Sequence, residues 1–105
     1  MRIFIIGKYM TGNTKKNIKH AKEVMAKLIR AGHDVFCAHT MTAGLDRIGL
    51  DDECREMHLR WMEVCDAVFL LDEWEVSVGS RKEYQVALNR GMTIYRERNV
   101  IWDGF

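Results

Sequence analysis

Uninterrupted apolar stretches alternate with amphipathic ones along the chain, and this pattern predicts strands that alternate with helices. The stretches Ile3 to Ile6 and Ala67 to Leu71 are apolar at every position, as is typical of strands buried on both faces. Val35 to Ala38 and Met92 to Tyr95 predict two further strands. The segment Asn99 to Trp102 leaves open whether the sheet has a fifth strand.

Two of the amphipathic stretches predict helices after the first and second strands. The first helix has Asn13 or Thr14 as its cap, carries apolar residues at three- and four-residue steps, and stops at Gly32. The second begins at Asp51 or Asp52. One face of this second helix is predicted to carry the stripe Cys54, Met57, Trp61 and Cys65.

A third helix is predicted between Ser80, as its cap, and Gly91, while 39–50 and 72–79 are predicted to be loops. Strand, helix and strand in succession form a right-handed crossover, which makes neighbouring strands parallel. The fold class is therefore α/β: a single domain over 1–105, built as a three-layer sandwich around a parallel four- or five-stranded sheet, of flavodoxin or Rossmann-like type.

Parallel sheets of this kind bind ligands beyond the carboxyl ends of their strands, where crossover loops and helix N-termini gather. In this chain that edge is formed by 7–13, 39–50, 72–80 and, after the fourth strand, 96–99. We expect the chemistry of the protein to lie in these segments.

The composition narrows the possible partners. With 105 residues the chain is long enough for one domain, and its net charge of +1 favours neither nucleic acid nor an anionic membrane surface as a partner. No apolar run approaches the roughly 18 residues of a membrane span, and the three cysteines form no C-x-x-C pair. These features predict a cytoplasmic protein with reduced thiols.

Glu83 is the acid with the strongest claim to a chemical role, and the sequence supports two interpretations of it. It stands three residues after Ser80, which is the capping-box spacing, and a capping glutamate bonds to the backbone of its own helix. Alternatively, Glu83 faces the ligand edge as an ionised carboxylate, which is the group needed for covalent attack on a sugar anomeric carbon. The two interpretations require different orientations of one side chain.

Three other residues at the predicted edge have both structural and functional interpretations. Asp72, directly after the third strand, is positioned to bind a hydroxyl or a base edge. Trp74 either closes the core or offers a stacking face, and His39 either donates to a ligand or makes a structural hydrogen bond. The histidines show no metal-ligand spacing such as H-E-x-x-H, so no metal site is predicted.

The glycine-containing loop from Gly7 to Asn13 follows the first strand and opens the first helix. It matches neither the phosphate-binding G-x-x-x-x-G-K-[ST] loop nor the G-x-G-x-x-G dinucleotide motif, which argues against ATPase and NAD-dependent activities. Backbone amides of such a loop can still receive an anion.

Four ordered sequence blocks resemble the nucleoside 2-deoxyribosyltransferase superfamily over roughly residues 2–95, and most closely a small bacterial and phage branch of it. The blocks are Gly7-x-Tyr9 with Gly12 and Asn17-Ile18, His39-Thr40-x-Thr42-Ala43, Cys65-Asp66-Ala67-Val68, and Trp74-Glu75-x-Ser77-x-Gly79-Ser80-x-x-Glu83. Together they are much more specific than any one of them alone.

The resemblance implies an enzyme that breaks the N-glycosidic bond of a nucleoside or nucleoside monophosphate without a cofactor. Glu83 would be the nucleophile that forms a glycosyl-enzyme intermediate, Tyr9 would lie near it, and Asp72 would line the sugar or base pocket. Members commonly pair their subunits, so a homodimer or higher homo-oligomer is implied, with 102–105 closing a neighbour's pocket. The residues expected to bind substrate are Gly7, Gly12, Asn13, His39, Trp74, Ser77, Gly79 and Ser80.

One departure from the family pattern affects the predicted chemistry. Many members carry an acid on the second helix, eight residues before the aspartate that matches Asp66, and this chain has His58 there. The leading hypothesis is a hydrolase or transferase with Glu83 as nucleophile. The alternatives are a catalytically inactive nucleotide-binding or sensing module of the same fold, which the change at His58 favours, and a structural domain in which Glu83 only caps its helix.

Overall fold

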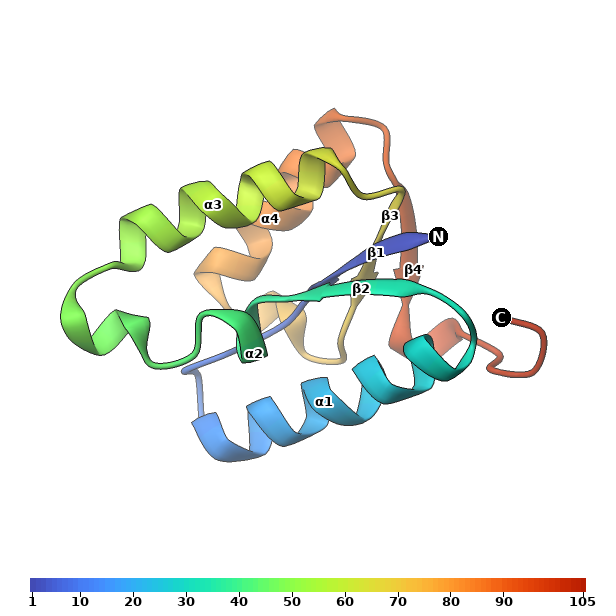
Figure 1. Cartoon of the computed structure of the whole chain (residues 1–105), viewed down its shortest axis with the longest axis horizontal. Helices are drawn as coiled ribbons and strands as arrows, with labels where there is room; N and C mark the ends of the chain where they lie inside the picture. Colours follow the sequence, from blue (N-terminus) through green and yellow to red (C-terminus); the bar gives the residue numbers. More distant parts are fainter.

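The apolar stretches of the chain form one parallel sheet in the computed structural model, which describes residues 1–105. The strands are β1 (Arg2–Ile6), β2 (Asp34–Cys37), β3 (Ala67–Leu70) and β4 (Thr93–Arg96). Their order in the sheet is β2-β1-β3-β4, and all three neighbouring pairs are parallel (Figure 1). The two central strands, β1 and β3, are the ones whose sequences are apolar without alternation, because both of their faces are covered.

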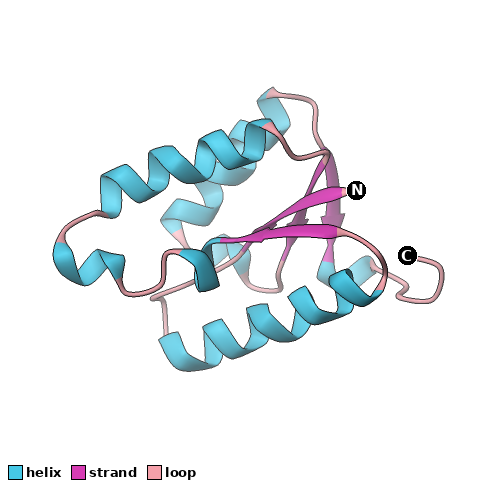
Figure 2. Cartoon of the chain, viewed as in Figure 1, coloured by secondary structure: helices cyan, strands magenta, loops and turns pink.

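Helices cover both faces of this sheet (Figure 2). Helix α1 (Thr14–Arg30) lies on one face, and α3 (Asp51–Glu63) and α4 (Val78–Asn89) lie on the other (Figure 1). The predicted three-layer α/β sandwich of Rossmann-like type is confirmed, with four parallel strands. None of the helices combines the length and the apolar character that crossing a bilayer requires.

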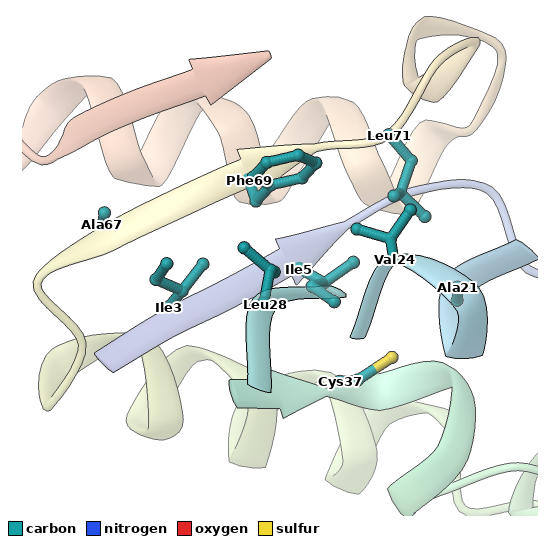
Figure 3. Packing of buried hydrophobic residues seen from close by; sticks show 9 residues of the cluster. All are labelled: Ile3, Ile5, Ala21, Val24, Leu28, Cys37, Ala67, Phe69 and Leu71. Carbon is teal, nitrogen blue, oxygen red and sulfur yellow. The ribbon is translucent and has the colours of Figure 1, made fainter. Parts of the chain in front are cut away.

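A hydrophobic core lies on each face of the sheet, and helix α1 shows how the sequence pattern determines one of them. The side chain of Asn13 caps the helix by accepting from the Lys16 amide at 3.0 Å. Apolar side chains at three- and four-residue steps along the helix then pack against β1, β2 and β3 (Figure 3). The fully buried members from the helix are Ala21, Val24 and Leu28.

The two segments predicted as loops contain short helical turns. The segment 39–50 contains the one-turn helix α2 (Ala38–Met41) and the 3-10 turn η1 (Leu45–Ile48), and 72–79 contains the 3-10 turn η2 (Trp74–Val76). The open question of a fifth strand is answered: the chain leaves β4 through the 3-10 turn η3 (Glu97–Asn99) and continues through 99–102 without ladder pairing. The apolar residues of that segment serve side-chain packing instead.

The C-terminal segment packs on the α1 face of its own sheet. Trp102 and Phe105 both contact the ring of Phe69, with centroids 5.7 and 6.3 Å away, and Phe105 also meets Tyr95 at 4.8 Å. The segment therefore extends the core beside α1, on the face opposite α3 and α4.

Gly7 allows the chain after β1 to pass close to Leu71, and we expect its replacement to destabilise the fold. A Cβ at Gly7 would lie 2.6 Å from Leu71 Cδ1 and 3.0 Å from Leu71 Cβ. Gly7→Ala should therefore lower the free energy of unfolding by about 1 to 3 kcal/mol, measured by urea titration. Gly79→Ala is the matched control, since its nearest neighbour would be Ser77 Oγ at 4.0 Å. Equal stabilities of the two variants would contradict the expected clash.

Candidate active site

A cavity of about 300 Å³ opens at the carboxyl edge of the sheet, on the side of α3 and α4. This volume lies at the lower end of the range for small-molecule sites. Its walls come from the residues after β1, from α2, and from one face each of α3 and α4. The position agrees with the sequence-based expectation, because β1 and β3 are the neighbouring strands from which the chain turns in opposite directions across the sheet.

Helix α4 begins earlier than the sequence predicted, and this decides the orientation of Glu83. The cap is Ser77, whose side chain accepts from the Ser80 amide at 3.3 Å, so the prediction that Ser80 caps the helix was wrong. Glu83 therefore lies in the second turn, beyond reach of the cap amide, and the capping-box interpretation does not apply. The favourable effect of the helix N-terminus on a carboxylate is also weaker there than the sequence suggested.

Glu83 instead directs its carboxyl group into the cavity. The side chain is 19 % exposed, and its nearest charged or titratable partner is His58, with Oε2 3.8 Å from Nδ1. Burial raises the pKa of Glu83 to about 8, because no hydrogen-bond donor compensates for the lost water. The group is therefore mainly protonated at neutral pH, whereas a nucleophilic carboxylate has to be ionised.

His58 is held by its second ring nitrogen and by aromatic neighbours. The Thr42 hydroxyl lies 3.1 Å from the Ala38 carbonyl oxygen and 3.0 Å from His58 Nε2. A carbonyl only accepts, so the hydroxyl donates its one proton to Ala38 and accepts from Nε2–H. Trp61 packs beside the imidazole with ring centroids 5.2 Å apart. The neutral ring therefore presents an unprotonated Nδ1 to Glu83.

Burial lowers the pKa of His58, and the neighbouring His39 lowers it further when charged. The same desolvation thus favours a neutral imidazole and a neutral carboxyl. Glu83 and His58 face each other as a neutral pair that contains one titratable proton.

Tyr9 lines the same cavity, as the sequence predicted, and its loop is tightly held. The phenolic oxygen accepts from the Gly44 amide at 2.9 Å, so the phenolic proton is free for a ligand. The buried Asn17 amide donates to the backbone oxygens of Tyr9 and Thr11 at 2.8 and 2.9 Å. These bonds fix the loop between β1 and α1 against the cavity.

His39 also lines the cavity, but its ring is occupied by structural contacts. Nε2 donates to the Lys8 carbonyl oxygen at 2.7 Å, and Nδ1 lies 3.8 Å from the Cys37 sulfur. The side chain is buried, and desolvation lowers its pKa. Of its two interpretations, the structural hydrogen bond is the one observed.

The first turn of α4 contributes three of the predicted substrate-binding residues: Ser77, Gly79 and Ser80 line the cavity together with Gly7. Ser80 is 2 % exposed and its hydroxyl has no hydrogen-bond partner. A buried hydroxyl without a hydrogen-bond partner destabilises the fold. A ligand in the cavity could supply the missing hydrogen bond to Ser80.

Four other predicted site residues lie elsewhere. Asp72 faces a separate cavity of about 250 Å³ and stands 3.8 Å from Arg98, so the structure does not bring it together with Glu83. Trp74 is buried against Tyr84, with centroids 4.4 Å apart, and belongs to the core. Asn13 caps α1, and Gly12 has a φ of 79° in the turn before it.

The sequence analysis did not place four of the residues that line the cavity: Thr42, Arg55, His58 and Lys82. For two of them a signal was present, since Thr42 belongs to one of the four blocks that carry the resemblance and His58 stands where many members have an acid. Arg55 and Lys82 had no signal, because their position depends on how α3 and α4 meet. The structure contains no cluster of His, Cys, Asp and Glu side chains arranged to hold a metal ion.

The family model described as "Domain of unknown function (DUF4406)" matches residues 1–96. No curated protein matches the chain.

Proposed function

Because the chain belongs to the DUF4406 family, whose description assigns no activity, we propose a function from the cavity itself: cleavage of the N-glycosidic bond of a nucleoside or nucleoside monophosphate, with Glu83 as nucleophile. The observation that carries the proposal is the isolated carboxyl group of Glu83. It is the one acid among the residues that line the cavity, and it faces the space where a ligand would lie.

The proposed reaction is a double displacement. A carboxylate oxygen of Glu83 bonds to the anomeric carbon while the bond from that carbon to the base nitrogen breaks and its electron pair leaves with the base. Water or a second base then releases the sugar from Glu83. The proposed reaction uses no cofactor. We also propose that the protein is cytoplasmic, and that its subunits pair as the resemblance implies.

The first turn of α4 supports the monophosphate as substrate. A helix N-terminus with free amides favours anions, and the unpartnered Ser80 hydroxyl adds a donor at the same place. Arg55 and Lys82 supply positive charge at the cavity wall.

We expect Ser80→Ala to weaken the binding of a nucleoside monophosphate about tenfold, which corresponds to one lost hydrogen bond to a charged group. Binding of the matching nucleoside should be unchanged. Calorimetry with both ligands measures the difference. Thr11→Ala is the control, since this exposed residue near the start of α1 does not line the cavity. If only Thr11→Ala weakened the binding of the monophosphate, the phosphate would lie at the start of α1 and not at α4.

The proposed function is tested by incubating the purified protein with ribo- and deoxyribonucleosides and their monophosphates. Chromatography then detects free base, and in the presence of a second base it detects the exchanged nucleoside. The absence of base release from every compound would rule out the activity for that panel.

A nucleotide-binding module without catalysis is the second candidate. The observation in its favour is that burial keeps Glu83 mainly uncharged at neutral pH. Tight binding of a nucleotide in calorimetry, without turnover in the same panel, would support this candidate.

A further inference from the structure

The cavity lacks the second carboxylate that a retaining glycosidic mechanism normally uses. Such enzymes place two carboxyl groups about 5 to 5.5 Å apart, one as nucleophile and one as proton carrier. Glu83 has no acidic neighbour among the residues that line its cavity, and Asp72 belongs to the other cavity. The carrier of the proton must therefore be a group of another kind.

The titratable and charged groups that line the cavity together with Glu83 come from four segments: Tyr9 after β1, His39 from α2, Arg55 and His58 from α3, and Lys82 from α4. Near neutral pH only an imidazole both takes and gives a proton readily. His39 is excluded because its Nε2–H is bound to the Lys8 carbonyl and its Nδ1 faces a thiol. His58 remains, with a free nitrogen toward the carboxyl group.

We propose that His58 and Glu83 share one proton, which His58 holds at Nδ1 while Glu83 acts as a carboxylate. The contact between Nδ1 and Oε2 at 3.8 Å and the hydrogen bond from Nε2–H to Thr42 carry this inference. The role of the pair in catalysis rests on the proposed function, whereas the sharing of the proton does not.

This shared proton serves both the formation of the glycosyl-enzyme intermediate and its hydrolysis. The carboxyl proton moves from Glu83 to Nδ1, which leaves a carboxylate beside an imidazolium. As the carboxylate bonds to the anomeric carbon and the bond to the base breaks, the imidazolium gives its proton to the departing base nitrogen. When water attacks the anomeric carbon, Nδ1 takes a proton from that water and the electron pair of the sugar–Glu83 bond returns to the carboxylate. The pair again holds one proton at the end.

Thr42 is the positioning residue of this arrangement. Its hydroxyl is bound to Ala38 and to His58 at once, which keeps the hydrogen of the neutral ring on Nε2 and directs Nδ1 to Glu83. Trp61 at 5.2 Å and Phe4 at 6.5 Å pack around the imidazole and restrict its rotation.

The test is an NMR titration of the full chain, which follows the side-chain carboxyl carbon of Glu83 and the ring nitrogens of His58 from pH 4 to 10. In the unaltered protein both groups should respond to the same two proton-binding steps, since groups in contact titrate as a pair. In His58→Gln the Glu83 signal should titrate in one step, displaced by about one pH unit or more from the steps of the pair. In Glu83→Gln the His58 signals should likewise show one step.

The control is His20→Gln, an exposed histidine paired with Glu97 outside this cavity, which should leave the titration of Glu83 unchanged. Thr42→Val should give a mixture of the two neutral tautomers of His58, whereas Thr42→Ser should retain the one with hydrogen on Nε2. A Glu83 titration that is identical with and without His58 overturns the proposal.

Activity provides a separate comparison once the nucleotide panel gives a substrate. His58→Gln should then lower kcat about 10²- to 10⁴-fold and remove one limb of its pH profile, as loss of a general acid and base does. A purely structural His58 would leave the shape of the pH profile unchanged, which also contradicts the catalytic role. If the panel yields no substrate, the NMR titration still decides whether the two groups share a proton.

Discussion

Glu83→Gln should reduce base release at least about 10³-fold, because glutamine keeps the size of the side chain and removes the nucleophilic oxygen. The cavity offers no replacement, since none of its other lining residues is an acid. Single-turnover assays with the substrate found in the panel measure the loss. They also separate it from any change in binding.

The matched control is Glu75→Gln, which alters an exposed glutamate whose carboxylate lies 3.6 Å from Arg98 and which does not line the cavity. This variant should retain the activity of the unaltered protein. Trapping adds an independent check: mass spectrometry of the quenched reaction should find the sugar attached to Glu83. Activity that persists in the Glu83→Gln protein would assign the chemistry to another residue.

The second large effect concerns stability as a function of pH. Burial raises the pKa of Glu83 to about 8, from 4.5 for the free side chain, so between these values the folded protein binds more protons than the unfolded chain. Glu83 therefore makes the free energy of unfolding fall as the pH rises through this window. Below the unfolded histidine pKa of 6.5 the buried His39 and His58, whose pKa values are lowered, oppose this fall, so the net decrease is expected above that pH. A shift of this size corresponds to a total change of about 3 to 5 kcal/mol.

Glu83→Gln should remove most of the decrease expected above the unfolded histidine pKa of 6.5, because glutamine has no proton to lose. Urea unfolding at several pH values between 5 and 9 gives the comparison. Glu75→Gln again serves as control and should keep the slope of the unaltered protein. The same slope in the unaltered and Glu83→Gln proteins would show that the buried carboxyl group is not its origin. A proton shared with His58 preserves the sign, since the folded pair still holds more protons than its unfolded counterparts near pH 7.

The fold followed from local sequence features to a large extent. The continuous apolar runs of β1 and β3 predicted strands covered on both faces, and helices between them predicted a parallel sheet. The prediction was less successful where hydrophobic and polar residues follow no regular period along the chain. The turns α2 and η1 within 39–50 depend on contacts with other elements, such as the bond from Gly44 to Tyr9.

For the site, the residue pattern identified Glu83, and the resemblance implied that Tyr9, Ser77, Gly79 and Ser80 lie near it; the structure brings these residues together in one cavity. It did not determine which way Glu83 points. The sequence predicted Ser80 as the cap of α4, whereas the structure has Ser77 there, and this difference decides whether Glu83 reaches the cap. Only the extended backbone of Ser77, with φ −101° and ψ 124°, shows that this residue is the cap.

The sequence by itself determined the succession of strands and helices along the chain, because hydrophobic periodicity and capping are properties of neighbouring residues. What only the tertiary structure decided is the environment of each polar side chain. Asp72 and Glu83 are both acids at the same edge of the sheet, yet one is exposed beside Arg98 and the other is desolvated beside His58. Desolvation arises between residues distant in sequence, and it alone raises the pKa of Glu83 to about 8.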